Sequence, residues 1–374
     1  MKRVDVCVRG GGAVGSSLAL ALARHGVEVA LSERPPASAV ADVRAYALGP
    51  AAVALLQELR VWDSLPPDAL TPVQEMRIAG DGPGDAAGQL AFTAWQQCVT
   101  ALAWIVDATA LEQILAAALR FAPNVTRVPA PVPAALQAIC EGRDSATRAE
   151  LGVEFDRHPY SQNALAARVT TDQPHQGVAR QWFRSPDVLA LLPFDRPQPQ
   201  HSFGLVWSLP EEQASRWLQA DVGDFETALN EATGGAAGTL RLASERASWP
   251  LAVGRARRWF GPGWVLVGDA AHVVHPLAGQ GLNLGLADVA SLVQVLVAAR
   301  HAFPWRPLGD ERALGRYARD RLAPTVAMGF VTDGLLQLFA PPAAPLRELR
   351  NRGLTLVNRV PWLKRWLAER ALQG

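Results

Sequence analysis

Short apolar runs and Ala/Leu-rich stretches alternate at the start of the chain. Residues 4–8 are mostly apolar and predict a buried strand, and the Ala/Leu-rich stretch that ends at His25-Gly26 predicts a helix. Residues 27–31 form a second apolar run and predict another strand. Strand, helix and strand in this order are typical of a βαβ unit in a parallel sheet.

A period of two dominates the middle of the chain. Residues 164–169 and 202–207 show alternating patterns, which predict strands with one buried face. Residues 76–97 are rich in Gly and Asp and predict a hairpin or loop of the same layer. Helices are expected near residues 211–220 and 224–232. Together these patterns predict a sheet that is separate from the N-terminal unit.

Composition limits the class of protein. The chain has 374 residues, 49% of them hydrophobic, which is enough for two domains or one large composite domain. The net charge of +1 gives no indication of nucleic acid binding. Cys7, Cys98 and Cys140 form neither a disulfide framework nor a zinc motif, which fits a reducing compartment. The chain begins Met1-Lys2-Arg3 and enters a predicted strand at once, so we expect no signal peptide and a cytoplasmic location.

A glycine pattern connects the first strand to the first helix. Gly10, Gly12 and Gly15 form G-x-G-x-x-G, and Glu33 follows the second strand, 18 positions after the last glycine. In a dinucleotide site these glycines provide a tight turn, close approach of the pyrophosphate and helix–strand packing, and the acid binds a ribose. The alternative is a tight turn in an α/β domain without a ligand. The residues expected to bind the nucleotide are Gly10, Gly12, Ala13, Val14, Gly15, Glu33 and Arg34.

A second motif, GDAAHVVHPLAGQGLNLGLAD, occupies residues 268–288. It follows an apolar strand-like segment, and its second glycine turn opens a long apolar helix. Asp269 can accept hydrogen bonds from hydroxyl groups or act as a helix N-cap, and both roles are compatible. A nicotinamide dehydrogenase has no need of this second motif, whereas the ribityl chain and ring of FAD do. The residues expected here are Asp269, Gly279, Gln280, Gly281, Leu282 and Asn283.

With both motifs in place, the chain resembles the FAD-dependent aromatic hydroxylases related to p-hydroxybenzoate hydroxylase. Within that group it is most similar to the ubiquinone-biosynthesis hydroxylases. The similarity covers nearly the whole chain. The segments that carry it are residues 42–48, 178–183, 189–193, 249–251, 268–288 and 349–354.

The resemblance implies an α/β fold with a Rossmann-like FAD-binding domain interleaved with a mostly antiparallel β-sheet substrate domain, plus C-terminal helices. The FAD-binding domain is expected in residues 1–75, 98–150 and 250–325. The substrate domain is expected in residues 76–97 and 151–249, and the C-terminal helical region in residues 326–374. NAD(P)H would dock transiently without a domain of its own.

The same resemblance implies the reaction. NAD(P)H reduces the flavin, O2 reacts there, and one oxygen atom is transferred to the ring of a polyprenylated phenol. Arg44 and Pro276 are expected beside the flavin as positioning residues, with a surface ion pair and a turn proline as the alternatives. His272 and His275 lack a third ligand nearby, so no metal site is expected. A hydrogen-bonded structural role is favoured for them over that of a catalytic base.

Two features depart from the family pattern. Glu141 stands where the family usually has Asp, within Cys140-Glu141-Gly142-Arg143. Only about 20 residues separate the helix that ends near Phe121 from Glu141. Prolines there predict an extended connection in place of several strands. These departures put FAD affinity in question but leave the flavin-ring site unaffected.

The C-terminal segment has the composition of a membrane-surface helix. Residues 346–374 carry seven Lys or Arg residues against two Glu residues, interspersed with Leu, Val and Trp. Such a segment suits an anionic membrane, and packing against this protein or a partner is the alternative. Two other functions stay open: a low-turnover FAD-binding subunit of a ubiquinone-biosynthesis complex, and a soluble hydroxylase of small aromatic acids.

Overall fold

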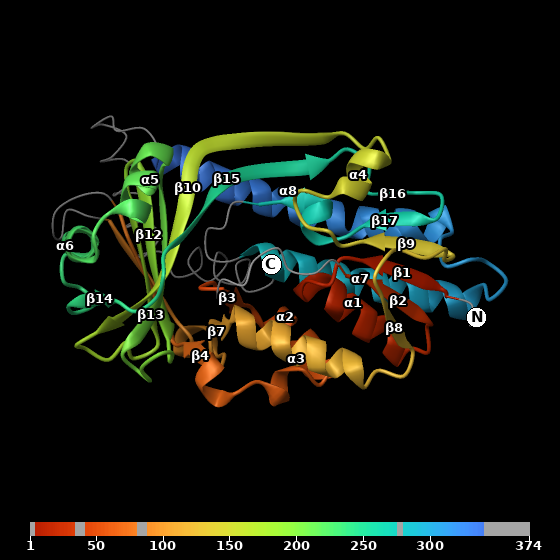
Figure 1. Ribbon diagram of the computed structural model, residues 1–374, viewed down its shortest axis with the longest axis horizontal. Helices are drawn as coiled ribbons and strands as arrows, with labels where there is room; N and C mark the ends of the chain where they lie inside the picture. The colour runs from red at the N-terminus through yellow and green to blue at the C-terminus, as the bar shows by residue number, and fades with distance from the viewer. Residues whose placement is uncertain (1–3, 34–41, 81–87, 275–279, 340–374) are drawn as a thin grey trace.

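The computed structural model describes the chain except for residues 1–3, 34–41, 81–87, 275–279 and 340–374. Of residues 280 and 328–339 only the backbone is described. A parallel sheet with its helices lies at one end of the molecule, and a large, mostly antiparallel sheet lies at the other (Figure 1). Two long strands, β10 (Phe155–Thr171) and β15 (Ala247–Ala256), run between the two ends.

The parallel sheet contains the predicted βαβ unit. β1 pairs with β2 on one side and with β9 on the other, both in parallel. The strand order is β16-β17-β9-β1-β2-β8, and only β16 is antiparallel to its neighbour. Its strands are β1 (Val6–Arg9), β2 (Val29–Ser32), β8 (Val125–Val128), β9 (Leu136–Ile139), β16 (Phe260–Gly261) and β17 (Trp264–Leu266).

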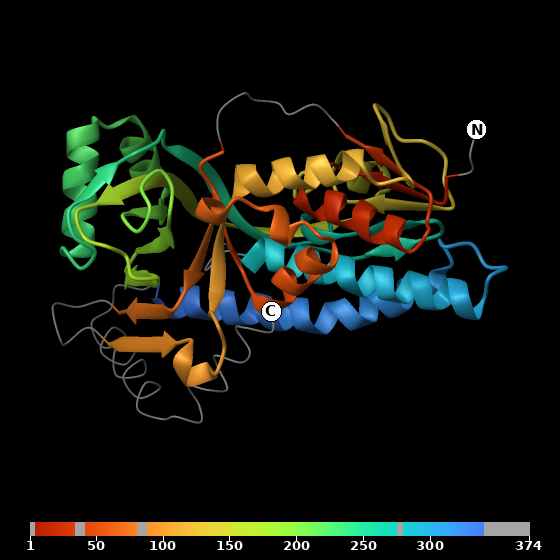
Figure 2. The ribbon, with the colours of Figure 1, turned by 90° about the horizontal axis from the view of Figure 1, so that it is seen from below.

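Four helices pack side by side in the order α3, α1, α7, α8 (Figure 2). Nine of the 12 residues of α1 are buried, because its Ala/Leu-rich surface lies between the sheet and the neighbouring helices. The helices are α1 (Ala13–Arg24), α2 (Pro50–Glu58), α3 (Ala108–Arg120), α4 (Ala146–Glu150), α7 (Gln280–Ala302) and α8 (Glu311–Phe339). Short 3-10 helices occupy Trp62–Ser64, Pro67–Ala69, Trp95–Gln97 and Gly268–Ala270.

The large sheet has the order β18-β15-β10-β13-β12-β11-β5-β6, with β14 also pairing with β10. Only the β11–β5 pair is parallel. One face is covered by α5 (Glu211–Gln219) and α6 (Val222–Thr233), which bury a core that includes Phe203, Trp207 and Phe225. The remaining strands are β5 (Glu75–Ala79), β6 (Gln89–Thr93), β11 (Val178–Arg184), β12 (Asp187–Phe194), β13 (Ser202–Pro210), β14 (Leu240–Leu242) and β18 (His272–Val273).

A small antiparallel sheet joins the two ends. It consists of β3 (Ala45–Leu48), β7 (Ala103–Asp107) and β4 (Leu70–Val73), in the order β3-β7-β4. It packs on the large sheet so closely that a Cβ on Gly204 would lie 3.3 Å from the Cβ of Ala45. Strand β3 is therefore in contact with the large sheet as well as with the end of the molecule that holds the parallel sheet.

Most elements expected from the sequence are confirmed. The strands at residues 164–169 and 202–207 lie in β10 and β13, and the two expected helices are α5 and α6. One expectation needs correction: the proline-containing connection holds a strand, β8, which extends the parallel sheet beyond β2. The expected boundary at residue 325 also falls inside one continuous helix, α8, next to Pro324.

Helix α7 is long and apolar enough to cross a membrane by length and composition. More than half of that stretch is buried inside the protein. Its contacts with α1, α2 and α8 account for the apolar sequence.

Candidate active site

The turn between β1 and α1 is built from glycine for two different reasons. Gly10 has a φ of +108°, and a Cβ there would lie 2.4 Å from the carbonyl oxygen of Cys140. A Cβ on Gly15 would lie 1.9 Å from the carbonyl oxygen of Gly10. At Gly12, by contrast, an added Cβ would meet nothing within 4 Å. Gly10 and Gly15 are thus required by packing, and Gly12 leaves open space at the start of α1.

The N-terminus of α1 is free to receive an anion. The N-cap residue, Gly12, has no side chain with which to cap the helix, and no other side chain of the described residues is bonded to its first N–H groups. The first N–H groups of a helix lack partners within the helix and carry partial positive charge. Open space and uncapped donors at one point are the arrangement that binds a pyrophosphate.

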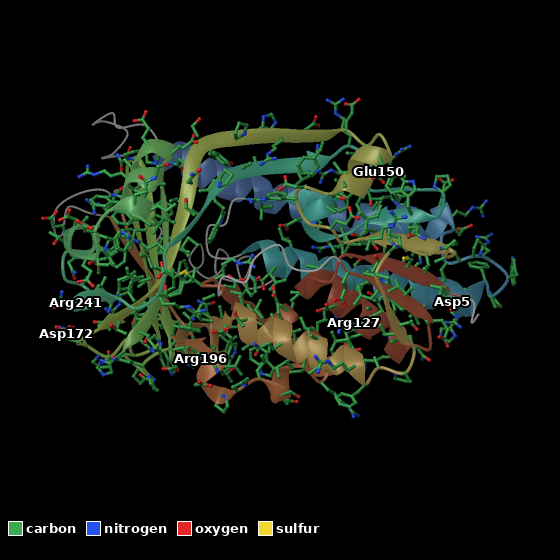
Figure 3. All side chains as sticks on the ribbon, viewed as in Figure 1. Asp5, Arg127, Glu150, Asp172, Arg196 and Arg241 are labelled. Atoms are coloured by element: carbon green, nitrogen blue, oxygen red, sulfur yellow. The ribbon has the colours of Figure 1, made fainter. Side chains whose placement is uncertain are left out.

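Glu33 lies across the same turn, after β2. An added Cβ on Gly11 would be 2.5 Å from the Cγ atom of Glu33. Arg127, labelled in Figure 3, donates hydrogen bonds of 2.8 Å from Nε and 2.7 Å from Nη2 to the two carboxylate oxygens. The sequence analysis missed Arg127, because its proximity depends on the pairing of β8 with β2. Arg34 lies outside the described residues.

Asp269 lies just after β17, in the short helix Gly268–Ala270. It is not an N-cap: the N-cap of that short helix is Val267. Burial raises the pKa of Asp269, while the charges of His272, Arg143 and Arg44 act to lower it. In the described part of the chain no group donates a hydrogen bond to this half-buried carboxylate. It can therefore accept hydrogen bonds from the hydroxyl groups of a ribityl chain.

Asp269 borders a cavity of about 150 Å³ between β10, β15 and the start of α7. Its walls are mostly apolar, and two arginines and Asp269 supply the charges. Gly281 also borders it, and an added Cβ there would be 4.0 Å from Oδ1 of Asp269. The lining residues are Arg143, Phe155, Arg157, Trp249, Pro250, Leu251, Ala252, Val253, Asp269, Val273, Val274 and Gly281.

A buried carboxylate holds the Gly268–Asp269 turn in place. Asp288 of α7 is 0% exposed and accepts hydrogen bonds from the Gly268 backbone N–H at 3.0 Å and from Nε2 of His272 at 2.6 Å. Its other oxygen accepts from Nε of Arg321 at 2.7 Å. Burial opposes ionisation, yet the charges and hydrogen bonds of His272 and Arg321 lower the pKa of Asp288. His272 therefore has the structural role that the sequence analysis favoured, and His275 lies outside the described residues.

Asn283, in the first turns of α7, uses its amide for structure. Its Nδ2 donates to the carbonyl oxygen of Ala47 at 2.7 Å, and its Oδ1 accepts from the N–H of Gly49 at 2.8 Å. The side chain thus fastens α7 to β3 and α2. Leu282 is half-buried, and Pro276 and Gly279 lie outside the described residues.

Arg44 has a partner within its own segment. Its Nε donates to Oδ1 of Asp42 at 2.8 Å, and its Nη2 lies 2.5 Å from Oδ2. The guanidinium lies 5.6 Å from the ring centre of Tyr46, whose pKa burial raises to about 12. The side chain of Arg44 is 46% exposed, so it lies at the edge of the site.

Glu141 folds back onto the N-terminus of α4. Its carboxylate accepts from Oγ of Ser145 at 2.7 Å and from the backbone N–H and Oγ1 of Thr147 at 3.0 and 2.7 Å. Burial acts to raise the pKa of Glu141, but these hydrogen bonds outweigh it, so the pKa is lowered. Arg148 of the same helix donates to the carbonyl oxygen of Ala270 at 3.0 Å. The longer carboxylate thus orders the segment beside Asp269.

Comparison with known proteins decides the family. The FAD binding domain family matches residues 3–128 and 131–326. A ubiquinone hydroxylase, UbiL, of Rhodospirillum rubrum is 31% identical over 99% of this chain and 90% of its own length. The chain belongs to the ubiquinone-biosynthesis family of FAD-dependent hydroxylases. It is also 32% identical to the 3-demethoxyubiquinol 3-hydroxylase of Escherichia coli, over 98% of both chains.

Solved structures agree on the fold. The p-nitrophenol 4-monooxygenase PnpA of Pseudomonas putida superposes with a TM-score of 0.77 at 19% identity, over 100% of this chain and 98% of that chain. PqsL of Pseudomonas aeruginosa gives a TM-score of 0.75 at 18% identity, over 94% and 99% of the two chains. The predicted fold class and the resemblance are confirmed. The protein is an FAD-dependent monooxygenase, and the open space at Gly12 and the half-buried Asp269 carboxylate fit that cofactor.

Proposed function

We propose that this protein hydroxylates the aromatic ring of a polyprenylated phenol or quinol in ubiquinone biosynthesis. The overall reaction consumes the ring C–H bond, O2, NAD(P)H and a proton, and it yields the ring hydroxyl group, water and NAD(P)⁺. The observation that carries this proposal is the similarity to the E. coli 3-demethoxyubiquinol 3-hydroxylase over 98% of both chains. When bound, the flavin supplies electron transfer from the reductant and activation of O2.

Residues of the first turn would bind the adenine-dinucleotide end. The open space at Gly12 and the backbone N–H groups of Ala13 and Val14 suit the pyrophosphate. Glu33, oriented by Arg127, suits the ribose hydroxyl groups. Gly10 and Gly15 would act indirectly, by allowing β1, α1 and β9 to pack at this distance.

Residues of the second motif would bind the ribityl chain and the ring. The carboxylate of Asp269 would accept from ribityl hydroxyl groups. Reduced flavin carries negative charge, and the N-terminus of α7, at Gln280, Gly281 and Leu282, would stabilise it, together with Gly279 just before the helix. Asn283 would contribute through its backbone, because both ends of its amide are already bonded. Pro276 and Arg44 would flank the ring.

The cavity beside Asp269 supports the use of NAD(P)H. Arg143 and Arg157 line it, and both side chains are partly exposed, at 39% and 46%. Two guanidinium groups beside an apolar wall suit the phosphates and the ring of a nicotinamide cofactor. The apolar wall would also keep water from the flavin, which limits loss of oxygen as hydrogen peroxide.

A peripheral location at the cytoplasmic face of the inner membrane would bring the enzyme to its substrate. A polyprenylated phenol resides in the membrane, and residues 345–374 combine cations with Trp and Leu. The same segment would also provide a contact for other ubiquinone-biosynthesis proteins. These residues lie outside the described part of the chain.

The proposal is tested by deleting the gene and identifying the accumulated quinone precursor by mass spectrometry. We expect one prenylated precursor that lacks a ring hydroxyl group, and wild-type protein should restore ubiquinone. Normal ubiquinone in a strain without a second hydroxylase would overturn the pathway assignment. The purified protein should be yellow and should bleach with NAD(P)H in the presence of substrate.

The colour and the substrate range of the purified protein distinguish the two alternative functions. A colourless protein that nevertheless co-purifies with other pathway enzymes would indicate a low-turnover subunit. Hydroxylation of small aromatic acids, with no dependence on lipid, would indicate the soluble hydroxylase. Glu141 is hydrogen-bonded to Ser145 and Thr147, and an FAD titration of Glu141→Asp would show whether the longer side chain changes FAD affinity.

A further inference from the structure

Arg168 connects the large sheet to the segment that leads to Arg44. It lies on β10, and only 8% of it is exposed. Its Nε donates to the carbonyl oxygen of Val43 at 3.1 Å, and its Nη2 donates to the carbonyl oxygen of Arg44 at 3.0 Å. One buried side chain of the large sheet thus binds two consecutive carbonyl groups beside the predicted flavin site.

The surroundings hold this guanidinium in one orientation. Nη2 also donates to Oδ2 of Asp107 at 3.3 Å, and the guanidinium carbon lies 4.0 Å from the ring centre of Phe194. The neighbour of Arg168 on β13 is Gly204, over which Ala45 packs. Fixing both the donor and the backbone leaves little freedom for residues 43–45 to move relative to the sheet.

Only an arginine side chain can make the three hydrogen bonds that Arg168 makes to Val43, Arg44 and Asp107. A planar guanidinium can bind two adjacent carbonyl groups and a carboxylate at once, whereas a lysine ammonium is a single point donor. In the described part of the chain Nη1 has no partner, so the contacts to Val43, Arg44 and Asp107 use the other two nitrogens.

We propose that Arg168 is a positioning residue for the flavin: it fixes the Val43–Arg44 backbone to the large sheet and thereby sets the place of the flavin ring against the substrate. This inference rests on the proposed function, because it assumes that residues 42–48 flank the flavin. Arg168 touches neither cofactor nor substrate in the arrangement proposed. Its effect is exerted through Val43 and Arg44.

The test compares Arg168→Met and Arg168→Lys with a matched control, Arg196→Met. Arg196, labelled in Figure 3, also approaches Asp107, with Nη1 at 3.6 Å from Oδ2. Its hydrogen bonds, however, go to Asp68 and not to residues 43–44. The readouts are FAD affinity by fluorescence titration, the flavin absorption change on adding a phenol, and hydrogen peroxide released per NAD(P)H oxidised. The first two readouts need no natural substrate. The peroxide yield is measured with a phenol that the wild-type protein hydroxylates, because without hydroxylation all the electrons from NAD(P)H leave as hydrogen peroxide.

We expect Arg168→Met to weaken FAD binding about tenfold, to alter the flavin spectrum and to raise the peroxide yield several-fold. Arg168→Lys should lie between Arg168→Met and the wild type, and Arg196→Met should match the wild type in all three readouts. Wild-type flavin behaviour in a folded Arg168→Met protein would overturn the inference. So would equal effects of Arg168→Met and Arg196→Met, since these would indicate a general loss of stability.

A second variant covers the case in which Arg168→Met fails to fold. Gly204→Ala keeps every bond of Arg168 but places a methyl group 3.3 Å from the Cβ of Ala45. It should displace residues 43–45 slightly and change the flavin spectrum in the same direction, and an unchanged spectrum would count against the inference. If these flavin effects appear while no prenylated phenol is hydroxylated, the proposed pathway fails and the positioning role stands.

Discussion

In the two glycine turns, some residues allow close packing and others leave room for a ligand. Gly10 and Gly15 face protein atoms at distances that no Cβ can occupy, whereas Gly12 faces open space. Asp269 is a half-buried carboxylate without hydrogen-bond donors in the described part of the chain. It therefore makes the apoprotein less stable, and the hydroxyl groups of a bound cofactor would relieve that cost. The stability that Asp269 takes from the apoprotein is therefore consistent with a role in binding the cofactor.

Replacing Gly12 and Gly15 separately should distinguish the two roles. Gly15→Ala should destabilise the apoprotein by about 3 kcal/mol, because its methyl group overlaps the Gly10 carbonyl oxygen. Gly12→Ala should change apoprotein stability by less than about 0.5 kcal/mol but weaken FAD binding about tenfold or more. Urea denaturation and FAD titration measure the two effects. Equal loss of stability in both variants would contradict this division.

Asp269→Asn should weaken FAD binding about 10- to 100-fold, the loss expected for a hydrogen bond to a charged group. The apoprotein should behave in the opposite way. The folded-state pKa of Asp269 is raised, so its penalty is absent below the unfolded-state pKa and grows as pH rises through the folded-state pKa. Asp269→Asn should therefore raise the apoprotein Tm at pH 7 and not at pH 4. A lower Tm at pH 7 would contradict this assignment.

At the scale of elements, the start of α7 is fixed by contacts from three directions. Asn283 bonds to β3 and to the start of α2, Asp288 bonds to the Gly268 turn and to β18, and Arg321 reaches Asp288 from α8. A helix N-terminus stabilises charge only where it points, so these bonds determine whether α7 can serve the flavin. They lie far from the solvent and lock elements that are distant in sequence.

Asp288→Asn should lower the free energy of unfolding by about 3 to 5 kcal/mol, because it leaves Arg321 without its counter-charge and removes a carboxylate oxygen from the buried hydrogen bond to His272. Asp310→Asn is the matched control: its ion pair with Arg306 is 4.0 Å long and partly exposed, so the loss should stay below about 1 kcal/mol. Urea denaturation at pH 7 compares them. The lowered pKa of Asp288 means that its stabilisation is present above the unfolded-state pKa and is lost as pH falls through the folded-state pKa. The free energies of unfolding of the two variants should therefore converge at low pH.

At the scale of the whole molecule, the catalytic chemistry depends on how two ends meet. β10 and β15 extend from the large sheet toward the parallel sheet, and residues 42–48 contact both (Figure 1). The cavity beside Asp269 is lined by both long strands and by the second motif. Ring, reductant and substrate would meet where these parts join.

Removing residues 345–374 should abolish binding to vesicles that contain anionic lipid while FAD content stays unchanged. The reason is that the segment carries most of the clustered cations and apolar residues expected to contact a membrane. Vesicle co-sedimentation at low and at high salt measures the effect, and neutral vesicles are the control. Full binding by the truncated protein would assign membrane contact to another surface or to none.

The sequence by itself determined the cofactor and the fold class, because both depend on local features. The turn at Gly10–Gly15 and the Gly268–Asp269 strand end are each short motifs in which geometry follows from neighbouring residues. Tertiary structure alone decided which side chains support them. Arg127 with Glu33, Asp288 with Arg321, and Arg168 with Val43 are pairs from separate elements of the fold.

These pairs left no signal in the sequence because a hydrogen bond between distant segments depends on strand order and helix packing, not on local periodicity. Glu141 illustrates the same limit. Taken as a sequence feature it suggested a weakened site, whereas its longer side chain reaches Ser145 and Thr147 and orders the segment next to Asp269. The motifs in the sequence were sufficient to identify the cofactor. The positions of the residues around it depend on contacts that only the folded chain brings together.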